Sequence, residues 1–177
     1  LQLFIGDDEP QDQTDPTKIQ QTDKTEGIGI RYFFPALYGR LYSNASIGFS
    51  GIDNPYVKTH LEYPIFLDEW LFKATQNFKY SLEDKFDEWT TLYLDRKVLN
   101  NKIIRISTQR STNSEVRGME YTAQVSYRNT LKHDIGYNYY IAANGRTKDL
   151  PEALYANGMI PQEGVYNYST GVVWRQA

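Results

Sequence analysis

The tripeptide Asp-Glu-Trp occurs twice in the sequence, as Asp68-Glu69-Trp70 and as Asp87-Glu88-Trp89. A glycosidase uses two carboxyl groups that flank the scissile bond, and an aromatic ring beside them can stack on the sugar. Adjacent side chains of a β-strand point to opposite faces, however, so each pair offers only one carboxylate to each face. We therefore predict that the protein is not an enzyme, and we keep a glycosidase built on Asp68/Glu69 and Asp87/Glu88 as the alternative.

The two histidines, His60 and His133, give little support to other catalytic or metal chemistry. Each has charged neighbours in the sequence, and the chain contains neither a Gly-x-Ser-x-Gly elbow nor a glycine-rich phosphate loop. Cysteine is absent, which excludes disulfides, thiolate zinc sites and a cysteine nucleophile. We predict no catalytic residue, no metal site and no cofactor.

An acidic run at 7–16 opens a polar segment that continues to Glu26. Such a composition buries too little apolar surface to order itself, so we predict that residues 1–26 are an extended or disordered lead-in. The alternative is a calcium site formed by four aspartates, Asp7, Asp8, Asp12 and Asp15, although the run lacks the Asp-x-Asp-x-Asp-Gly order of a calcium loop. The acidic segment is also a candidate contact for a protein partner.

Length and composition exclude several classes of protein. A chain of 177 residues fits one domain. A net charge of −3 and a pI near 5.4 argue against a nucleic-acid partner, since phosphate binding needs clustered lysine and arginine. The longest stretch without a charge, Leu41 to Ile52, is too short for a transmembrane helix of ~20 residues. The chain is rich in aromatic residues, with 15 Tyr, 8 Phe and 3 Trp.

From residue 27 onward, apolar and polar residues alternate with the period of a β-strand. In 118–128, for example, five apolar or aromatic residues alternate with five polar ones: Met119, Tyr121, Ala123, Val125 and Tyr127 against Glu120, Thr122, Gln124, Ser126 and Arg128. The segment 69–80 follows the same rule, with Gln76 as the exception. We predict strands at 37–49, 56–63, 69–80, 86–95, 102–109, 118–128, 134–143 and 165–175. Region 27–177 is therefore expected to be all-β, an antiparallel up-and-down meander of about eight strands that forms a β-barrel or part of one.

Tyrosine and tryptophan are concentrated near the ends of the apolar faces, as amphipathic rings are at the two interfaces of a membrane. In this respect four segments resemble the β-barrel proteins of Gram-negative outer membranes, in particular the large uncharacterised proteobacterial ones: Trp70–Ser81, Gly118–Arg128, Asp134–Ala143 and Gly164–Gln176. Members of that family typically end in an aromatic residue, whereas this chain ends Trp174-Arg175-Gln176-Ala177. The departure is expected if the chain is a piece of a longer barrel.

The resemblance implies an outer-membrane location, contact with membrane lipid, a signal peptide that has been removed, and a structural or transport role. Eight aromatic residues are then expected at the membrane interfaces: Trp70, Tyr80, Trp89, Tyr121, Tyr127, Tyr137, Tyr166 and Trp174. Five charged residues are expected to face the lumen: Lys73, Lys79, Arg105, Glu120 and Arg128. Four further charges are assigned to the same polar faces: Glu62, Glu88, Arg110 and Arg117.

A second hypothesis is a soluble β-sandwich or lipocalin-like module, periplasmic or secreted, that binds a small apolar ligand or a carbohydrate. The two hypotheses make opposite claims about the alternating faces. In a membrane barrel, Val125 faces outward and Gln124 faces the interior. In a soluble module, Val125 is packed inside and Gln124 is in water.

Overall fold

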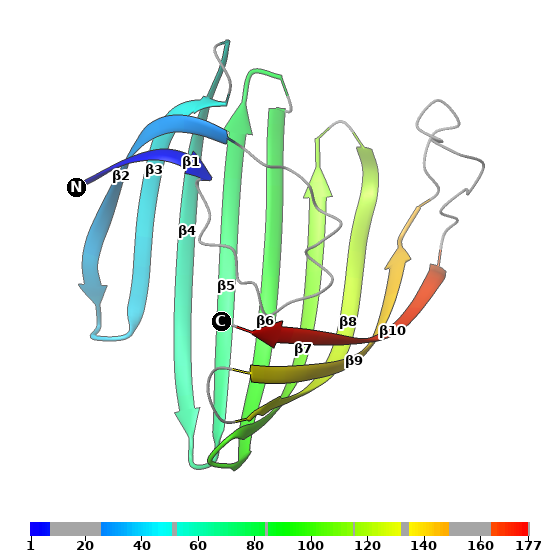
Figure 1. The fold of residues 1–177 in the computed structure, drawn as a ribbon. Helices are drawn as coiled ribbons and strands as arrows, with labels where there is room; N and C mark the ends of the chain where they lie inside the picture. Colours follow the sequence, from blue (N-terminus) through cyan, green and yellow to red (C-terminus); the bar gives the residue numbers. More distant parts are fainter. Residues whose placement is uncertain are drawn as a thin grey trace.

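The computed structural model describes residues 1–7, 26–50, 53–83, 85–114, 116–131, 135–148 and 164–176. Over these ranges the chain forms ten β-strands in a single antiparallel sheet, and no helix. The strands are β1 (Gln2–Asp7), β2 (Glu26–Leu37), β3 (Leu41–Ser50), β4 (Asn54–Leu67), β5 (Trp70–Ser81), β6 (Lys85–Leu99), β7 (Lys102–Asn113), β8 (Val116–Thr130), β9 (Ile135–Arg146) and β10 (Gly164–Gln176). Each strand pairs with its neighbours in the sequence (Figure 1), so the predicted all-β up-and-down meander is confirmed.

Two strands precede the first one predicted from the sequence. β1 lies within the segment predicted as the lead-in and pairs with β2, which covers residues before the predicted strand 37–49. The signal for β2 was present, because Ile28, Ile30, Tyr32 and Phe34 alternate, but glycines and Pro35 weaken it. The predictions for the acidic run, the calcium site and the partner contact fall on residues that lie almost entirely outside the described ranges.

The strands are staggered, so the sheet is tilted and curled rather than flat (Figure 1). A row of directly paired residues that starts at Phe34, near the β2–β3 turn, passes through Gln76 and reaches Gly145, near the opposite end of β9. A steady stagger of this kind is what allows a sheet to curl toward a barrel. Within the described ranges β1 and β10 do not pair with each other, so the sheet remains open.

The two faces of the sheet differ in polarity and in burial. On one face, Gln124 is 4% exposed and its paired neighbour Ala142 is 2% exposed. On the other face, Val125 is 52% exposed and its paired neighbour Ile141 is 68% exposed. We call the polar, buried face the inner face and the apolar, exposed face the outer face. The burial of its side chains in a single-layer sheet identifies the inner face as the concave one.

Tyrosine rings cover glycines on directly paired strands at two points in the sheet. Tyr121 on β8 is paired with Gly145 on β9, and a Cβ atom at Gly145 would overlap the tyrosine ring. Tyr140 is paired with Gly171, where a Cβ atom would lie 2.7 Å from the ring. A missing side chain therefore gives each ring a place to lie across the neighbouring strand, a known device for supporting glycine in a sheet.

We predict that Gly145→Ala destabilises the protein by about 1–3 kcal/mol, because the new methyl group displaces the Tyr121 ring. The matched control is Gly136→Ala on the same strand, where the new Cβ atom would lie 3.4 Å from its nearest neighbour, an ordinary contact. That change should stay within about 0.5 kcal/mol. Urea unfolding of both variants in the same medium measures the difference, and equal free-energy changes would contradict the prediction.

Candidate functional site

The inner face is organised around Tyr93, which lies on β6 and is 4% exposed. The Nζ atom of Lys73 on β5 lies 5.0 Å from the centre of its ring, and the Cζ atom of Arg105 on β7 lies 4.9 Å from it. Two cations thus share one aromatic ring, each within the range of a cation–π interaction. The alternation of the strands places all three side chains on the same face.

Each cation on Tyr93 also has a carboxylate partner. Arg105 binds Asp95 with two contacts, 2.7 Å from Nε to Oδ1 and 2.9 Å from Nη2 to Oδ2. Both of these side chains are about four-fifths buried, at 21% and 17% exposed. Lys73 lies 3.5 Å from Glu62. Paired hydrogen bonds between an arginine and a carboxylate fix orientation as well as charge, so this group is held in one arrangement.

A second group lies toward the β5–β6 turn. Lys58 lies 5.5 Å from the centre of the Trp89 ring, and Lys58 is directly paired with Lys79 on the neighbouring strand. His60 Nδ1 lies 2.7 Å from Oδ1 of Asn77, which is 6% exposed. Asn77 and Lys79 are buried in this group, and Asn77 has its partner in His60, as a polar group removed from water requires.

The described part of the inner face is cationic, although the whole chain carries a charge of −3. Its basic residues, assigned by strand pairing, are Arg31, Lys58, Lys73, Lys79, Lys85, Lys97, Arg105, Arg128 and Arg146. Its acidic residues, assigned in the same way, are Glu62, Asp87, Asp95 and Glu120. A surface of this kind attracts anions from solution.

All five charged residues predicted to face a lumen lie on the inner face: Lys73, Lys79, Arg105, Glu120 and Arg128. Glu120 forms an ion pair with Arg146, which is 4% exposed. Glu62, which was assigned to the same faces, is also there. The side chain of Arg117 lies outside the described residues.

Six of the aromatic residues predicted at membrane interfaces lie on the outer face: Trp70, Tyr80, Tyr121, Tyr127, Tyr137 and Trp174. The prediction for Trp89 is wrong, because strand pairing places Trp89 on the inner face with Lys58. The side chain of Tyr166 is outside the described residues.

The assignment of Glu88 and Arg110 to the polar face is also wrong. Both lie on the outer face, where Arg110 Nη2 donates to Glu88 Oε1 at 2.7 Å. Arg110 has the same strand phase as Ile104 and Ile106, which face outward. The phase of the strand therefore decides the face, and the charge of the side chain does not.

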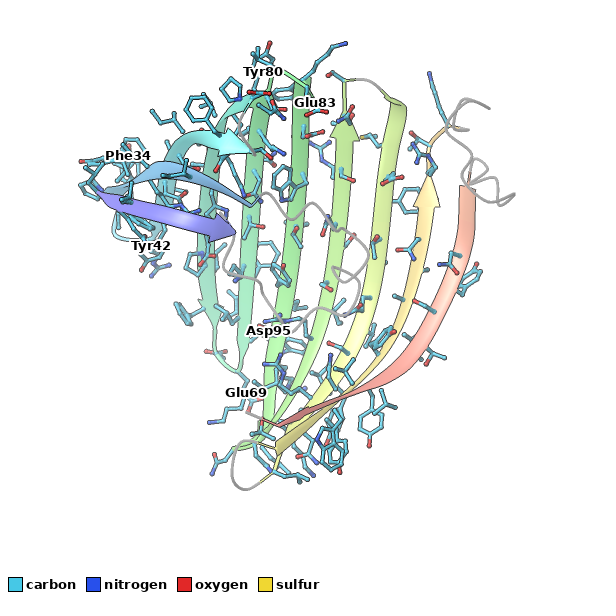
Figure 2. The ribbon with its side chains drawn as sticks, turned by 45° about the horizontal axis from the view of Figure 1, so that its top comes forward. Phe34, Tyr42, Glu69, Tyr80, Glu83 and Asp95 are labelled. Atoms are coloured by element: carbon cyan, nitrogen blue, oxygen red, sulfur yellow. The ribbon has the colours of Figure 1, made fainter. Side chains whose placement is uncertain are left out.

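The two Asp-Glu pairs do not form a cleft. Glu69 lies beside the β4–β5 turn and binds Arg96 at 2.7 Å, whereas Asp87 lies near the β5–β6 turn and binds Asn113. Figure 2 shows Glu69 near one end of the sheet and Glu83, of the β5–β6 turn, near the other. The glycosidase hypothesis thus finds no support in the geometry. Among the residues that the structure describes, no three His, Asp or Glu side chains converge as metal ligands.

We predict that Asp95→Asn destabilises the protein by about 1–3 kcal/mol, because the guanidinium of Arg105 keeps its place over Tyr93 but loses a charged acceptor. The matched control is Glu69→Gln, which removes a carboxylate that is 67% exposed from an ion pair with Arg96. Its effect should be about 0–1 kcal/mol. Urea unfolding measures both, and a larger loss for Glu69→Gln than for Asp95→Asn contradicts the prediction.

Comparisons with known proteins found no family model that matches the chain, and no curated protein or solved structure that matches it. The two faces of the sheet therefore provide the basis for a proposal of function. Their polarity, burial and aromatic residues are the observations that carry it.

Proposed function

We propose that the chain is a β-barrel protein of the Gram-negative outer membrane, or the described part of one, with a structural or transport role. The observation that carries this proposal is the inverted polarity of the sheet. Its exposed outer face is apolar and its buried inner face is polar. Lipid-facing strands of membrane barrels have this arrangement, because hydrocarbon surrounds the outside and water or polar groups fill the inside.

The outer aromatic residues support the proposal by their position along the strands. On β8, Tyr121 and Tyr127 flank Ala123 and Val125 on the outer face. The same order recurs on β10, where Tyr168 and Trp174 flank Thr170 and Val172. Aliphatic and small residues between two aromatic rings match a hydrocarbon core between two headgroup layers.

The lengths of the strands and the pairing of their backbones support the proposal as well. β5 has 12 residues and β8 has 15. A tilted transmembrane strand needs only about 9–11 residues to cross the hydrocarbon core. Backbone groups within the sheet pair with neighbouring strands, as they must where no water is available.

The soluble alternative requires the opposite orientation. It places residues such as Val125 and Ile141 in the interior, whereas these are 52% and 68% exposed. It places Gln124 in water, whereas Gln124 is 4% exposed. These exposures favour the membrane proposal over a lipocalin-like module.

The three tryptophans allow a direct test of the proposal. We prepare variants in which two tryptophans are replaced by phenylalanine, so that only Trp174 (outer face, 57% exposed) or only Trp89 (inner face) remains. In vesicles of brominated lipid, the fluorescence of Trp174 should be quenched and that of Trp89 should not, since bromine quenches only on contact. Vesicles of unbrominated lipid are the control. The proposal is wrong if Trp174 escapes quenching, or if the chain remains folded in buffer without lipid or detergent.

A second prediction concerns the cost of a charge on the outer face. Val125→Arg should destabilise the protein in lipid by about 2–4 kcal/mol, as expected for arginine near a bilayer midplane. The matched control is Gln109→Arg on the inner face, which should cost less than about 1 kcal/mol because that surface is polar. If the outer face were in water, Val125→Arg would change stability by only about 0.5 kcal/mol. Urea unfolding from vesicles distinguishes these outcomes.

A further inference from the structure

A hydrogen-bonded cluster of polar side chains interrupts the apolar outer face. We call it the outer polar cluster: Gln76 on β5, Glu88 and Thr90 on β6, and Arg110 on β7. Thr90 Oγ1 donates to Gln76 Oε1 at 2.5 Å, and Gln76 Nε2 donates to Glu88 Oε1 at 3.1 Å. Arg110 donates from Nη2 to Glu88 Oε1 at 2.7 Å and from Nε to Thr90 Oγ1 at 3.2 Å.

Apolar residues lie beside the cluster on the outer face. On β5, Gln76 stands between Ala74 and Phe78 on the outer face, and the ring of Tyr80 lies beyond them. On β6, Leu92 and Leu94 continue the outer face past Thr90. On β5 the cluster therefore lies farther from the strand end than the ring of Tyr80, and on β7 Arg110 pairs directly with Tyr121 of β8.

The hydrogen-bonding capacity of the cluster is not used up within the chain. An arginine side chain has five N–H donors. In Arg110, Nε and Nη2 each donate one hydrogen bond, and Nη1 makes a long contact of 3.9 Å with Met119 Sδ. Oε1 of Glu88 accepts two bonds, while Oε2 accepts none from the described residues. Arg110 is 53% exposed at its side chain and Glu88 is 23% exposed. Donors and an acceptor thus face outward.

Hydrocarbon cannot satisfy these groups. A charge within a bilayer is stable only when it is paired and hydrogen-bonded, and such residues usually face protein rather than lipid. We propose that a second copy of this chain covers the outer polar cluster, so that β5–β7 of two copies meet face to face. This inference rests on the membrane location proposed above, because water would otherwise serve the same groups.

The charges of the cluster fit a second copy better than an unrelated protein. The cluster carries one cation and one anion on adjacent strands, so it is complementary to itself. A twofold axis through it places Arg110 of each copy against the free Oε2 of Glu88 of the other, as in other isologous interfaces. The residues around the cluster on the outer face include Ala74 and Thr108, which are small enough to let two sheets approach closely.

The absence of cysteine from the sequence makes the test direct, since any introduced thiol is unique. We introduce Thr108→Cys or Thr90→Cys into the protein in lipid vesicles and add a short bifunctional thiol reagent. Thr108 is the next outward position to Arg110 on β7, and it lies outside the hydrogen-bonded cluster, so it serves if Thr90→Cys does not fold. The matched control is Ile141→Cys, which is on the outer face of β9 and 68% exposed.

We expect covalent dimers from the cysteines beside the cluster and few or none from the cysteine at 141. A dimer band of equal strength from all variants indicates random collision and overturns the proposal, as does the absence of dimers. Because the tryptophan experiment tests membrane insertion separately, quenching of Trp174 without dimers rejects the second copy alone. Dimers without quenching reject the membrane location alone.

A further comparison tests whether the polar groups themselves hold the two copies together. In the Thr108→Cys background, Glu88→Leu combined with Arg110→Leu should lower the dimer fraction about tenfold, the change that corresponds to the loss of a charge-assisted hydrogen bond. Quenching of Trp174 confirms that the variant is still inserted. Unchanged dimer yield from an inserted variant overturns the proposal.

Discussion

Contacts between polar side chains on the inner face stabilise this sheet where most soluble proteins use an apolar core. Few large apolar side chains are buried among the described residues, and the buried set contains Ser, Thr, Asn, Gln, Lys and Arg. Buried groups of this kind are stable only when each has a partner, because an unpaired donor or acceptor retains its full desolvation cost. The group around Tyr93 meets this requirement, with Arg105 and Lys73 each held by a ring and a carboxylate.

The side chains of the outer face are not buried against other side chains in this way. Its apolar side chains have no partner layer among the described residues, so the surrounding medium must provide one. In the membrane location proposed above, lipid would do this for Val125 and Ile141, and amphipathic rings such as Tyr121 and Trp174 would suit the boundary with water. The outer polar cluster is the exception on this face, because its side chains bind one another by hydrogen bonds and an ion pair.

Much of the sheet could be predicted from the sequence, because period-two alternation is strong in β5, β8 and β10. The phase of β6 could not be predicted, because aromatic or aliphatic residues occupy both of its faces: Trp89 and Tyr93 inside, Leu92 and Leu94 outside. A shift of one residue exchanges the two faces of a strand, so Trp89 was placed on the wrong side. Only its neighbours in the folded sheet, such as Lys58, decide its position.

Arg110 was misplaced for a different reason. Its spacing from Ile104 and Ile106 places it on the outer face, and its charge argued for the inner face. Spacing is a geometric constraint of the backbone, whereas the preference of a charge for polar surroundings can be met by a local cluster. The grouping of Arg110 with Glu88 and Gln76 could not be predicted, since it depends on the pairing register of three strands.

The nearest-neighbour order of the strands also has a consequence for folding. Every strand pairs only with the strands that precede and follow it, so the contacts are local in sequence and hairpins can be added one at a time. Each intermediate would present an unpaired edge and an uncovered apolar face at the same moment. Both features promote aggregation in water. Aggregation therefore competes most strongly with folding while hairpins are still being added to the sheet.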